Sequence, residues 1–290
     1  MPTIQAILAL LAITGRVPFR ILGAVLRSAA GVASGKLHLA GSNAKTDKGA
    51  KFGVLTATVS LSPEREAEPF TGRNTCPNAS AACAATCIVR TGRYRFCLNA
   101  PPRIARTMLW YWARPVFMRA LDLSISRLRA LAAFHRLQPA LRPNTLSDCL
   151  PTEAFARRYP DIAVYDYTAR IDRHLALLRA GKVPSNCHVT ASRKEDNADA
   201  VSRALAGGMN LAVVFDVKDP AAFPELYLGR PVIDGDQHDA RMMDRAPDGG
   251  PVIVGLTAKG TRAEIQRARD SGFSVQVPGA ERRRGLERAA

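Results

Sequence analysis

Three stretches of the chain decide the fold class: IAVYDYT at residues 162–168, CHVTAS at residues 187–192 and LAVVFD at residues 211–216. Each is a short apolar run that ends in polar residues, and a stretch with helical character follows it. Continuous apolar strands that alternate with helices are typical of a parallel sheet covered on both faces. The sequence therefore predicts an α/β fold built on a parallel sheet.

The same pattern recurs elsewhere in the chain. Residues 144–148, 231–236 and 251–256 are predicted strands, and residues 273–277 could form a last one. Residues 54–61, VLTATVSL, are rich in β-branched side chains and predict the first strand. With seven or eight strands, a parallel β/α barrel or partial barrel fits better than an open sheet. The glycine motifs GxGxxG and GxxxxGK[ST] are absent, which counts against a Rossmann or P-loop enzyme.

A long helical insertion is predicted after the first strand, from Pro101 to about Leu137. Pro102 fits the first turn of a helix, and Pro115 should kink or split it. The segment carries Arg103, Arg106, Arg114, Arg119, Arg127, Arg129 and Arg136. These arginines form either a solvated helix face or a ridge that contacts phosphates.

The composition indicates a folded chain with an anionic partner. Of 290 residues, 47% are hydrophobic and 23% charged, which supplies one sizeable core and argues against disorder. The 41 basic and 25 acidic residues give a net charge of +16. Nucleic acid is the expected partner and a membrane surface the second choice, although a GC-rich genome also favours arginine. We expect an extension at residues 1–40, a single β/α domain at 41–278 and a basic tail at 279–290.

The N-terminal extension has its own pattern. Residues 4–14 are apolar, and three arginines interrupt the stretch that follows. The apolar run is too short to span a bilayer, and its charges follow it instead of preceding it as in a signal peptide. Residues 4–31 could lie on a membrane surface as a basic amphipathic helix, pack on the domain, or be a mobile extension outside the native protein. Because the rest of the sequence shows no membrane-spanning segment either, a soluble cytoplasmic protein is expected.

Four cysteines lie within the loop after the first predicted strand: Cys76, Cys83, Cys87 and Cys97, spaced C-x6-C-x3-C-x9-C. In a cytosolic protein such a cluster favours a metal or iron–sulfur site over disulfides. C-x2-C pairs typical of zinc are absent, so an iron–sulfur cluster suits the spacing at least as well as zinc, and structural thiols are the third alternative. The first three cysteines form the stronger set, since Cys97 follows a turn and could face elsewhere.

Polar residues gather where the predicted strands end, and in parallel α/β folds the chemistry sits at the carboxyl ends of the strands. These ends carry Ser147, Asp148, Asp166, Tyr167, Thr168, Thr190, Ser192, Asp216, Asp234, Asp236, His238 and Asp239. Asp216 is expected to be a helix N-cap. Asp148 and the segment DGDQHD at 234–239 are better functional candidates, because they could bind a divalent metal or supply a general acid and base. A plain acidic turn is the alternative for that segment.

Asp148, Asp166, Ser192 and Asp236 come from four different predicted strands. In a parallel sheet they should line one cleft at the carboxyl edge, with the cysteine loop as its lid or wall. Carboxyl groups in one cleft raise one another's pKa unless a cation offsets them. Lys259, which follows the seventh predicted strand, is the candidate for that cation.

Two resemblances follow from these motifs. Three cysteines after the first strand of a partial β/α barrel resemble the layout of radical S-adenosylmethionine enzymes, although their usual C-x3-C-x2-C spacing is absent. More specifically, the ordered strings GSNAKTDKG, TCPNASAACAATC, LRPNTLSD, YDYT, PSNCHVTAS, VIDGDQHDAR and PVIVGLTAKG resemble the gene product 88 family of phage and plasmid proteins. This resemblance covers roughly residues 41–260. It implies a mobile-element origin and a shared site, without a named reaction.

The resemblance also carries over residue by residue. The matching polar residues are Asn43, Lys45, Cys76, Cys83, Cys87, Asn144, Ser147, Asp148, Asp166, Tyr167, Thr168, Asn186, Thr190, Ser192, Asp234, Asp236, His238, Asp239, Arg241 and Lys259. The chain departs from the family pattern at Ala169, where a basic residue is expected, and at Ile88, where an aromatic residue is expected. The first departure weakens a role for a cation at that strand end.

Three functions remain open on these residues. The first is a metal- or iron–sulfur-dependent enzyme acting on nucleic acid or a nucleotide, with S-adenosylmethionine as a further cofactor candidate. Its catalytic candidates are Asp148, Asp166, Asp236 and His238. Its substrate-binding candidates are Lys45, Asn144, Ser147, Thr168, Asn186, Thr190, Ser192, Arg241 and Lys259. The second is a transglycosylase-like DNA base modifier with structural zinc, and the third a non-catalytic replication accessory. The absence of a His-x-His pair argues against a rolling-circle nuclease.

Overall fold

The computed structural model describes residues 40–41, 43–90 and 100–278. These residues belong to two compact units. The first unit takes them from Met1–Pro77, Arg93–Asp166 and Pro184–His188, and the second from Asn78–Gly92, Tyr167–Val183 and Val189–Ala290. The expected single domain at 41–278 stays a prediction.

The strands confirm the predicted fold class. In sheet order they are β1 (Val54–Thr58), β2 (Gln138–Arg142), β3 (Ala163–Thr168), β4 (Cys187–Ser192), β5 (Leu211–Phe215), β8 (Ile253–Thr257), β7 (Arg230–Asp234) and β6 (Leu226–Tyr227). The β1–β2, β2–β3, β4–β5, β5–β8 and β7–β8 pairs are parallel, and the β6–β7 pair is antiparallel. The protein therefore has an α/β fold with a mostly parallel sheet, and closure into a barrel is not shown.

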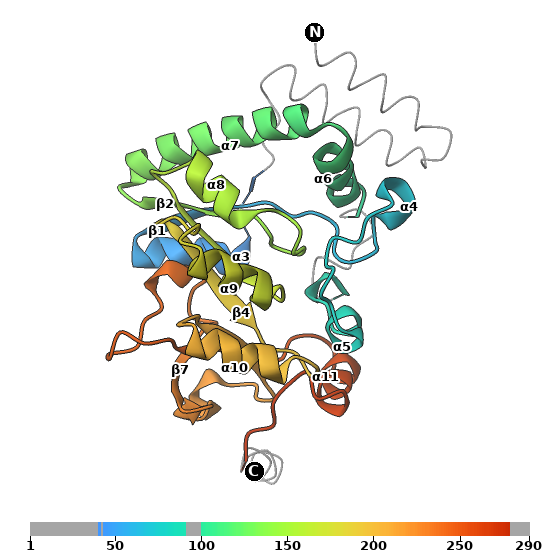
Figure 1. Ribbon diagram of the computed structural model, residues 1–290, viewed down its shortest axis with the longest axis vertical. Helices are drawn as coiled ribbons and strands as arrows, with labels where there is room; N and C mark the ends of the chain where they lie inside the picture. The colour runs from blue at the N-terminus through green and yellow to red at the C-terminus, as the bar shows by residue number, and fades with distance from the viewer. Residues whose placement is uncertain (1–39, 42, 91–99, 279–290) are drawn as a thin grey trace. The chain divides into compact units, whose positions relative to one another are not determined.

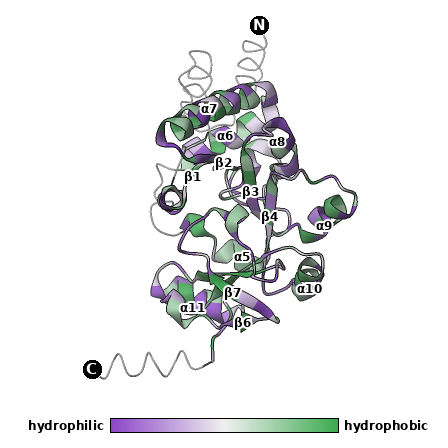
Figure 2. Cartoon of the chain, turned by 90° about the vertical axis from the view of Figure 1, so that its left-hand side faces the viewer, coloured by the Kyte–Doolittle hydropathy of each residue, from purple (hydrophilic) through white to green (hydrophobic). Residues whose placement is uncertain are grey.

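The first unit combines β1, β2 and the start of β3 with helices. These are α3 (Ala44–Asp47), the 3-10 helix η2 (Lys48–Phe52), α4 (Glu68–Thr71), α6 (Ala100–Trp112), α7 (Arg114–His135) and α8 (Thr152–Arg158). The predicted long helix is split at Ala113, and Pro115 occupies the first turn of α7, as expected. Helix α7 lies against β1 and β2 (Figure 1). Its mixed hydrophobic and hydrophilic colouring in Figure 2 is that of an amphipathic helix.

The second unit builds its core on both faces of β5. Its further elements are α5 (Ala81–Ala85), α9 (Ile171–Arg179), α10 (Ala198–Ala206), α11 (Arg262–Asp270) and the 3-10 helices η3 (Ile88–Arg90), η6 (Pro220–Ala222) and η7 (Arg241–Met243). Leu211 and Val213 share a buried cluster with Leu175 of α9 and Val201 of α10. Ala212, between them in sequence, belongs to a second cluster. This alternation explains why the strand is apolar throughout.

Two predicted strands differ from the structure, and one observed strand was not predicted. Residues 144–148 form a loop, because the second strand is QPALR at 138–142. Residues 273–277 form only an isolated bridge, from Val275 to Phe215. The short strand β6 was not predicted, since two residues carry no periodicity.

The described helices carry no membrane-spanning candidate. None of those within residues 40–41, 43–90 and 100–278 is both long and apolar enough to cross a bilayer. The proposed membrane contact of residues 4–31 and the basic tail at 279–290 lie outside the described residues.

Candidate functional site

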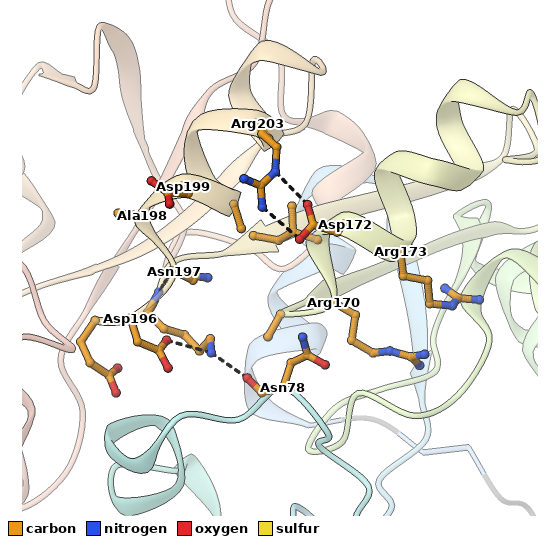
Figure 3. Close-up of a pocket in the computed structure, with 14 residues that line it drawn as sticks. Asn78, Arg170, Asp172, Arg173, Asp196, Asn197, Ala198, Asp199 and Arg203 are labelled. Carbon is orange, nitrogen blue, oxygen red and sulfur yellow. Dashed lines mark hydrogen bonds and ion pairs between the residues drawn. The ribbon is translucent and has the colours of Figure 1, made fainter.

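A pocket of about 700 Å³ lies in the second unit (Figure 3). Its walls come from two segments that each follow a strand: residues 169–173 after β3 and residues 194–200 after β4. Asn78 and Arg203 complete the lining. The pocket is therefore at the carboxyl ends of two neighbouring strands, where parallel α/β folds place their ligands.

The first turns of two helices line this pocket. They are residues 171–173 of α9 and residues 198–200 of α10. First-turn N–H groups have no acceptor within their own helix, and neither N-cap residue, Arg170 or Asn197, makes a capping hydrogen bond with its side chain. Both helices thus place the positive end of their dipole at the pocket, which favours an anion there.

The charged side chains of the pocket divide into paired and available groups. Asp172 accepts two hydrogen bonds from Arg203, at 2.9 and 3.0 Å, and these pairs hold its pKa below the ordinary value. The guanidinium of Arg170 makes no hydrogen bond or ion pair with the described residues. Figure 3 shows the side chains of Arg170 and Arg173 extending in the same direction. Arg170 is therefore a cation that an incoming anion can reach, in a lining whose four basic residues are balanced by the acidic residues Asp172, Glu195, Asp196 and Asp199.

Lys194 is the buried cation of the pocket, with 8% of its side chain exposed. Its ammonium donates a hydrogen bond to the backbone oxygen of Asn78 at 2.7 Å and pairs with Asp196 at 3.0 Å (Figure 3). A buried ammonium is costly unless such partners compensate for lost hydration. These two contacts therefore hold the loop after β4 against the segment that begins at Asn78.

Glu195 extends this connection to the cysteine-bearing segment. Its carboxylate accepts hydrogen bonds from Ser80 Oγ at 2.9 Å and from the Ala82 backbone N–H at 3.3 Å. Ser80 is the N-cap of α5, and its hydroxyl accepts a hydrogen bond from the backbone N–H of Cys83 at 3.1 Å. The pocket loop thus caps the helix that carries Cys83.

In the first unit, the predicted candidates Asn144, Ser147 and Asp166 come together. One oxygen of Asp166 accepts hydrogen bonds from Asn144 N, Asn144 Nδ2 and Thr152 Oγ1, at 3.2, 2.6 and 2.9 Å. Burial raises the pKa of Asp166 to about 7, although Arg142 and these hydrogen bonds oppose the rise. Such a carboxyl group exchanges a proton near neutral pH, but only 1% of Asp166 is exposed.

Asp148 lies close enough to Asp166 to contribute to the rise of its pKa. It is half-buried, and its backbone N–H donates to Thr75 O at 2.9 Å. Because Ser192 and Asp236 belong to the second unit, the single cleft expected for these four residues stays a prediction.

The DGDQHD segment contains two separate interactions in the second unit. Asp236 pairs with Lys259 at 3.0 Å, the cation expected for it, and accepts hydrogen bonds from Thr257 N and Oγ1 at 2.9 and 2.6 Å. Burial raises the pKa of Asp236, but the bonds from Thr257 and Lys259 outweigh it and leave the pKa below the ordinary value. His238 Nδ1 lies 3.2 Å from a guanidinium nitrogen of Arg241, which is fully buried beside Asp244.

The remaining predicted binding residues lie outside the lining of the pocket. Asn186 Nδ2 bonds the carbonyls of Ala156, Tyr159 and Ile162. Thr168 Oγ1 accepts from Arg170 N, Thr190 is buried, and Ser192 O accepts from Asn197. The Lys45 N–H donates to Asn43, the N-cap of α3.

The cysteine prediction is only partly covered by the described residues. Cys76, Cys83 and Cys87 are half-buried and form no disulfide with one another, and Cys97 lies outside the described residues. Cys76 belongs to the first unit, where its sulfur accepts the Glu64 N–H at 3.3 Å, whereas Cys83 and Cys87 belong to the second. Within the described part of the chain, no group of three or more His, Cys, Asp or Glu residues could hold a metal ion. The convergence of the cysteines stays a prediction.

Two expectations about charged residues were wrong. Asp216 is not a helix N-cap: Asp219 caps η6, and Asp216 is buried in an ion pair with Arg269 at 2.6 Å. Arg103 does not belong to a solvated or phosphate-contacting face, because it is buried against Glu66 at 2.6 Å. Amphipathic periodicity did not show this, since Arg103 reaches an acidic partner on another segment.

A family model described as gene product 88 matches residues 36–276. The chain belongs to the gene product 88 family. Comparisons with curated proteins and with solved structures give no match. All predicted site residues lie within the part that the family model matches.

In this member of the gene product 88 family, Ala169 lines the pocket where a basic residue was expected. Arg170, the next residue, also lines it, so the strand end still carries a cation. Sequence reasoning missed Arg170, Arg173 and Lys194. The available signal was the charged run RKEDN at 193–197, directly after the strand CHVTAS. From the sequence alone, this run is equally consistent with a solvated loop.

Proposed function

We propose that this gene product 88 family member binds the phosphate group of a nucleotide or nucleic acid in the pocket between the first turns of α9 and α10. The observation that carries this proposal is the shared lining: two helix N-termini and the cations Arg170 and Arg173 meet in one pocket. Backbone N–H groups and guanidinium groups are the usual partners of phosphate oxygens. The net charge of +16 supports a polyanionic ligand.

The reaction class that fits this placement is chemistry on the bound nucleotide or nucleic acid. The volume of about 700 Å³ is within the range of small-molecule sites and would take one or two nucleotides more readily than a duplex. Of the candidate carboxylates, Asp236 is in the same unit as the pocket. Its pKa is below the ordinary value, so it would be ionised and act as a base or as a ligand for a cation.

The cysteines would hold zinc or an iron–sulfur cluster in the enzyme form of this proposal. Thiolates are suitable ligands for both, and Cys76, Cys83 and Cys87 are half-buried cysteines. Two features support a metal or cluster at these cysteines: thiolates are suitable ligands, and the helix that carries Cys83 is bonded to the pocket loop. Anaerobic purification followed by iron, sulfide and zinc analysis tests this part. Less than 0.1 equivalent of either metal in full-length protein would remove it.

Binding of three probes tests the phosphate site directly: inorganic phosphate, adenosine 5′-monophosphate and a labelled single-stranded oligonucleotide. Arg170→Ala and Arg173→Ala should each weaken probe binding about tenfold, the loss expected for one charge-assisted contact. Arg179→Ala is the matched control, because Arg179 is exposed on the same helix but does not line the pocket. Equal binding by all three variants would contradict the proposed site.

The surface of α7 supports a second candidate, a nucleic-acid-binding accessory without catalysis. Arg119 and Arg127 are exposed on this helix. If they alone carried binding, oligonucleotides would bind and adenosine 5′-monophosphate would not, since a single nucleotide cannot bridge an extended surface. The same three probes therefore distinguish the two candidates.

A further inference from the structure

We propose that ligand binding in the pocket is coupled to the accessibility of Cys83 and Cys87 through Lys194 and Glu195. This inference rests on the proposed function, because it takes the ligand to be phosphate-bearing. It adds regulation to the site: the bound ligand protects the two thiols, and release of the cysteine-bearing segment weakens ligand binding.

The first step of the argument is that one loop serves both features. Residues 194–197 line the pocket, and the same loop contacts residues 78–82 through two neighbouring side chains. Lys194 bonds the backbone oxygen of Asn78 at 2.7 Å, and Asn78 itself lines the pocket. A phosphate bound there meets groups from both sides of this contact.

The second step runs from the loop to the thiols. Glu195 holds Ser80 Oγ at 2.9 Å, and Ser80 Oγ in turn holds the N–H of Cys83 at 3.1 Å. Cys87 follows α5 directly after its C-cap residue, Thr86. A helix of five residues has little stability of its own, so α5 depends on contacts such as this cap. Loss of the cap should loosen the helix and expose both thiols.

The third step is linkage. A ligand that contacts Asn78 and Lys194 stabilises the arrangement in which the loop grips the segment. By thermodynamic reciprocity, any change that opens the segment must then lower the affinity of the pocket for the ligand by the same factor. A coupling of five- to tenfold corresponds to the usual range for linked sites, about 1 kcal/mol.

The experiment measures iodoacetamide alkylation of individual cysteines by mass spectrometry in the full chain, with and without saturating adenosine 5′-monophosphate. Affinity for the same probe is measured in parallel. Cys149 is the internal reference, since it is half-buried and belongs to the first unit. The probe should slow alkylation of Cys83 and Cys87 at least fivefold and leave Cys149 unchanged.

Ser80→Ala is the decisive variant, because Ser80 does not line the pocket. Without probe, this variant should raise the alkylation rates of Cys83 and Cys87. It should also lower the affinity for the probe severalfold. Ser202→Ala on α10 is the matched control, since its hydroxyl bonds only Ala198 O within its own helix. Circular dichroism checks folding. Should Ser80→Ala unfold, Glu195→Gln tests the same link through the alkylation rates without probe, because Glu195 itself lines the pocket.

The outcomes separate the two proposals. Probe binding with protection that Ser80→Ala abolishes supports the coupling. Probe binding with unchanged alkylation in the original chain and in Ser80→Ala overturns the coupling and leaves the proposed function in place. If neither adenosine 5′-monophosphate nor the oligonucleotide binds, the proposed function fails and the coupling fails with it.

Discussion

Asn144 bonds the same carboxylate oxygen of Asp166 twice, through its backbone N–H at 3.2 Å and its side-chain amide at 2.6 Å. The side-chain oxygen of Asn144, Oδ1, accepts from Ser147 Oγ and from Leu150 N–H, at 3.1 and 2.9 Å. This one side chain therefore fastens the loop after β2 to a carboxyl group on β3. The protonation state of that carboxyl should affect the stability of the fold.

Unfolding free energy should fall as pH rises through the window set by Asp166. Burial raises the pKa of Asp166 to about 7, whereas an unfolded aspartate titrates near ~4. Between these values the folded chain holds a proton that the unfolded chain has lost, so this group destabilises folding increasingly with pH, by at most about 1.4 kcal/mol per pH unit. Urea unfolding from pH 4 to 8 measures the slope. Asp166→Asn should flatten it, and an identical slope in both proteins would refute this assignment.

Replacing Gly235 by alanine should destabilise the second unit. Gly235 follows β7 and donates its N–H to Gly255 O, and an added Cβ would lie 2.4 Å from a methyl carbon of Val254 and 2.8 Å from Gly255 O. Overpacking of this kind costs about 1–3 kcal/mol. Gly41→Ala is the control, because its Cβ would meet no atom of the described residues within 4 Å. Thermal unfolding of both variants makes the comparison, and equal midpoints would contradict the packing argument.

Two neighbouring glutamates should differ in their contribution to stability. Glu66 pairs with the buried Arg103, which is 5% exposed, whereas Glu68 pairs with the largely exposed Arg65. Glu66→Ala removes a carboxylate that compensates a buried charge and should cost about 3 kcal/mol. Glu68→Ala should cost less than about 1 kcal/mol. Denaturant titration measures the unfolding free energy of both variants. A smaller loss for Glu66→Ala than for Glu68→Ala would show that water compensates the charge of Arg103.

Oligonucleotide binding should weaken steeply with salt, because phosphate contacts release counterions. The double variant Arg119→Ala/Arg127→Ala should lower the slope of log K against log salt by about two if α7 contacts the strand. Binding of adenosine 5′-monophosphate should not change, because neither residue lines the pocket. An unchanged slope would show that basic residues other than Arg119 and Arg127 contact the strand. If the oligonucleotide does not bind even at low salt, the net charge of +16 does not reflect a nucleic-acid partner.

The sequence predicts the apolar strands well and β2 poorly, for a physical reason. CHVTAS matches β4 residue for residue, because an apolar run in a covered sheet has few alternatives. Strand β2 contains Gln138, Pro139 and Arg142, which lack strand propensity. The pairing of β2 with β3 begins only at Ala140. Pro139 has no backbone N–H, and at its position the pairing with β3 does not need one. The polar run NTLSD instead forms the loop that Asn144 holds.

The pocket was not predictable from residue types alone. Lys194 and Glu195 belong to a charged run that is usually solvated, yet they contact residues more than 110 positions away in the sequence. The sequence correctly placed Thr168 and Ser192 at the ends of strands, next to the segments that line the pocket. It did not predict that the first turns of the following helices form the lining. Such positions are set by tertiary contacts, which no local pattern records.

The three carbonyls around Asn186 have a consequence for chemical ageing of the protein. Deamidation requires the next backbone nitrogen, that of Cys187, to attack the side-chain amide carbon and expel ammonia. In the folded chain that nitrogen donates to Pro184 O at 3.0 Å, and the amide nitrogen is held by the carbonyls of Ala156, Tyr159 and Ile162. Folding thus shields Asn186, while an unfolded chain is open to the reaction. Once converted to aspartate, the side chain would set a carboxylate against three carbonyl oxygens, so molecules that deamidate during heating should not regain the original fold.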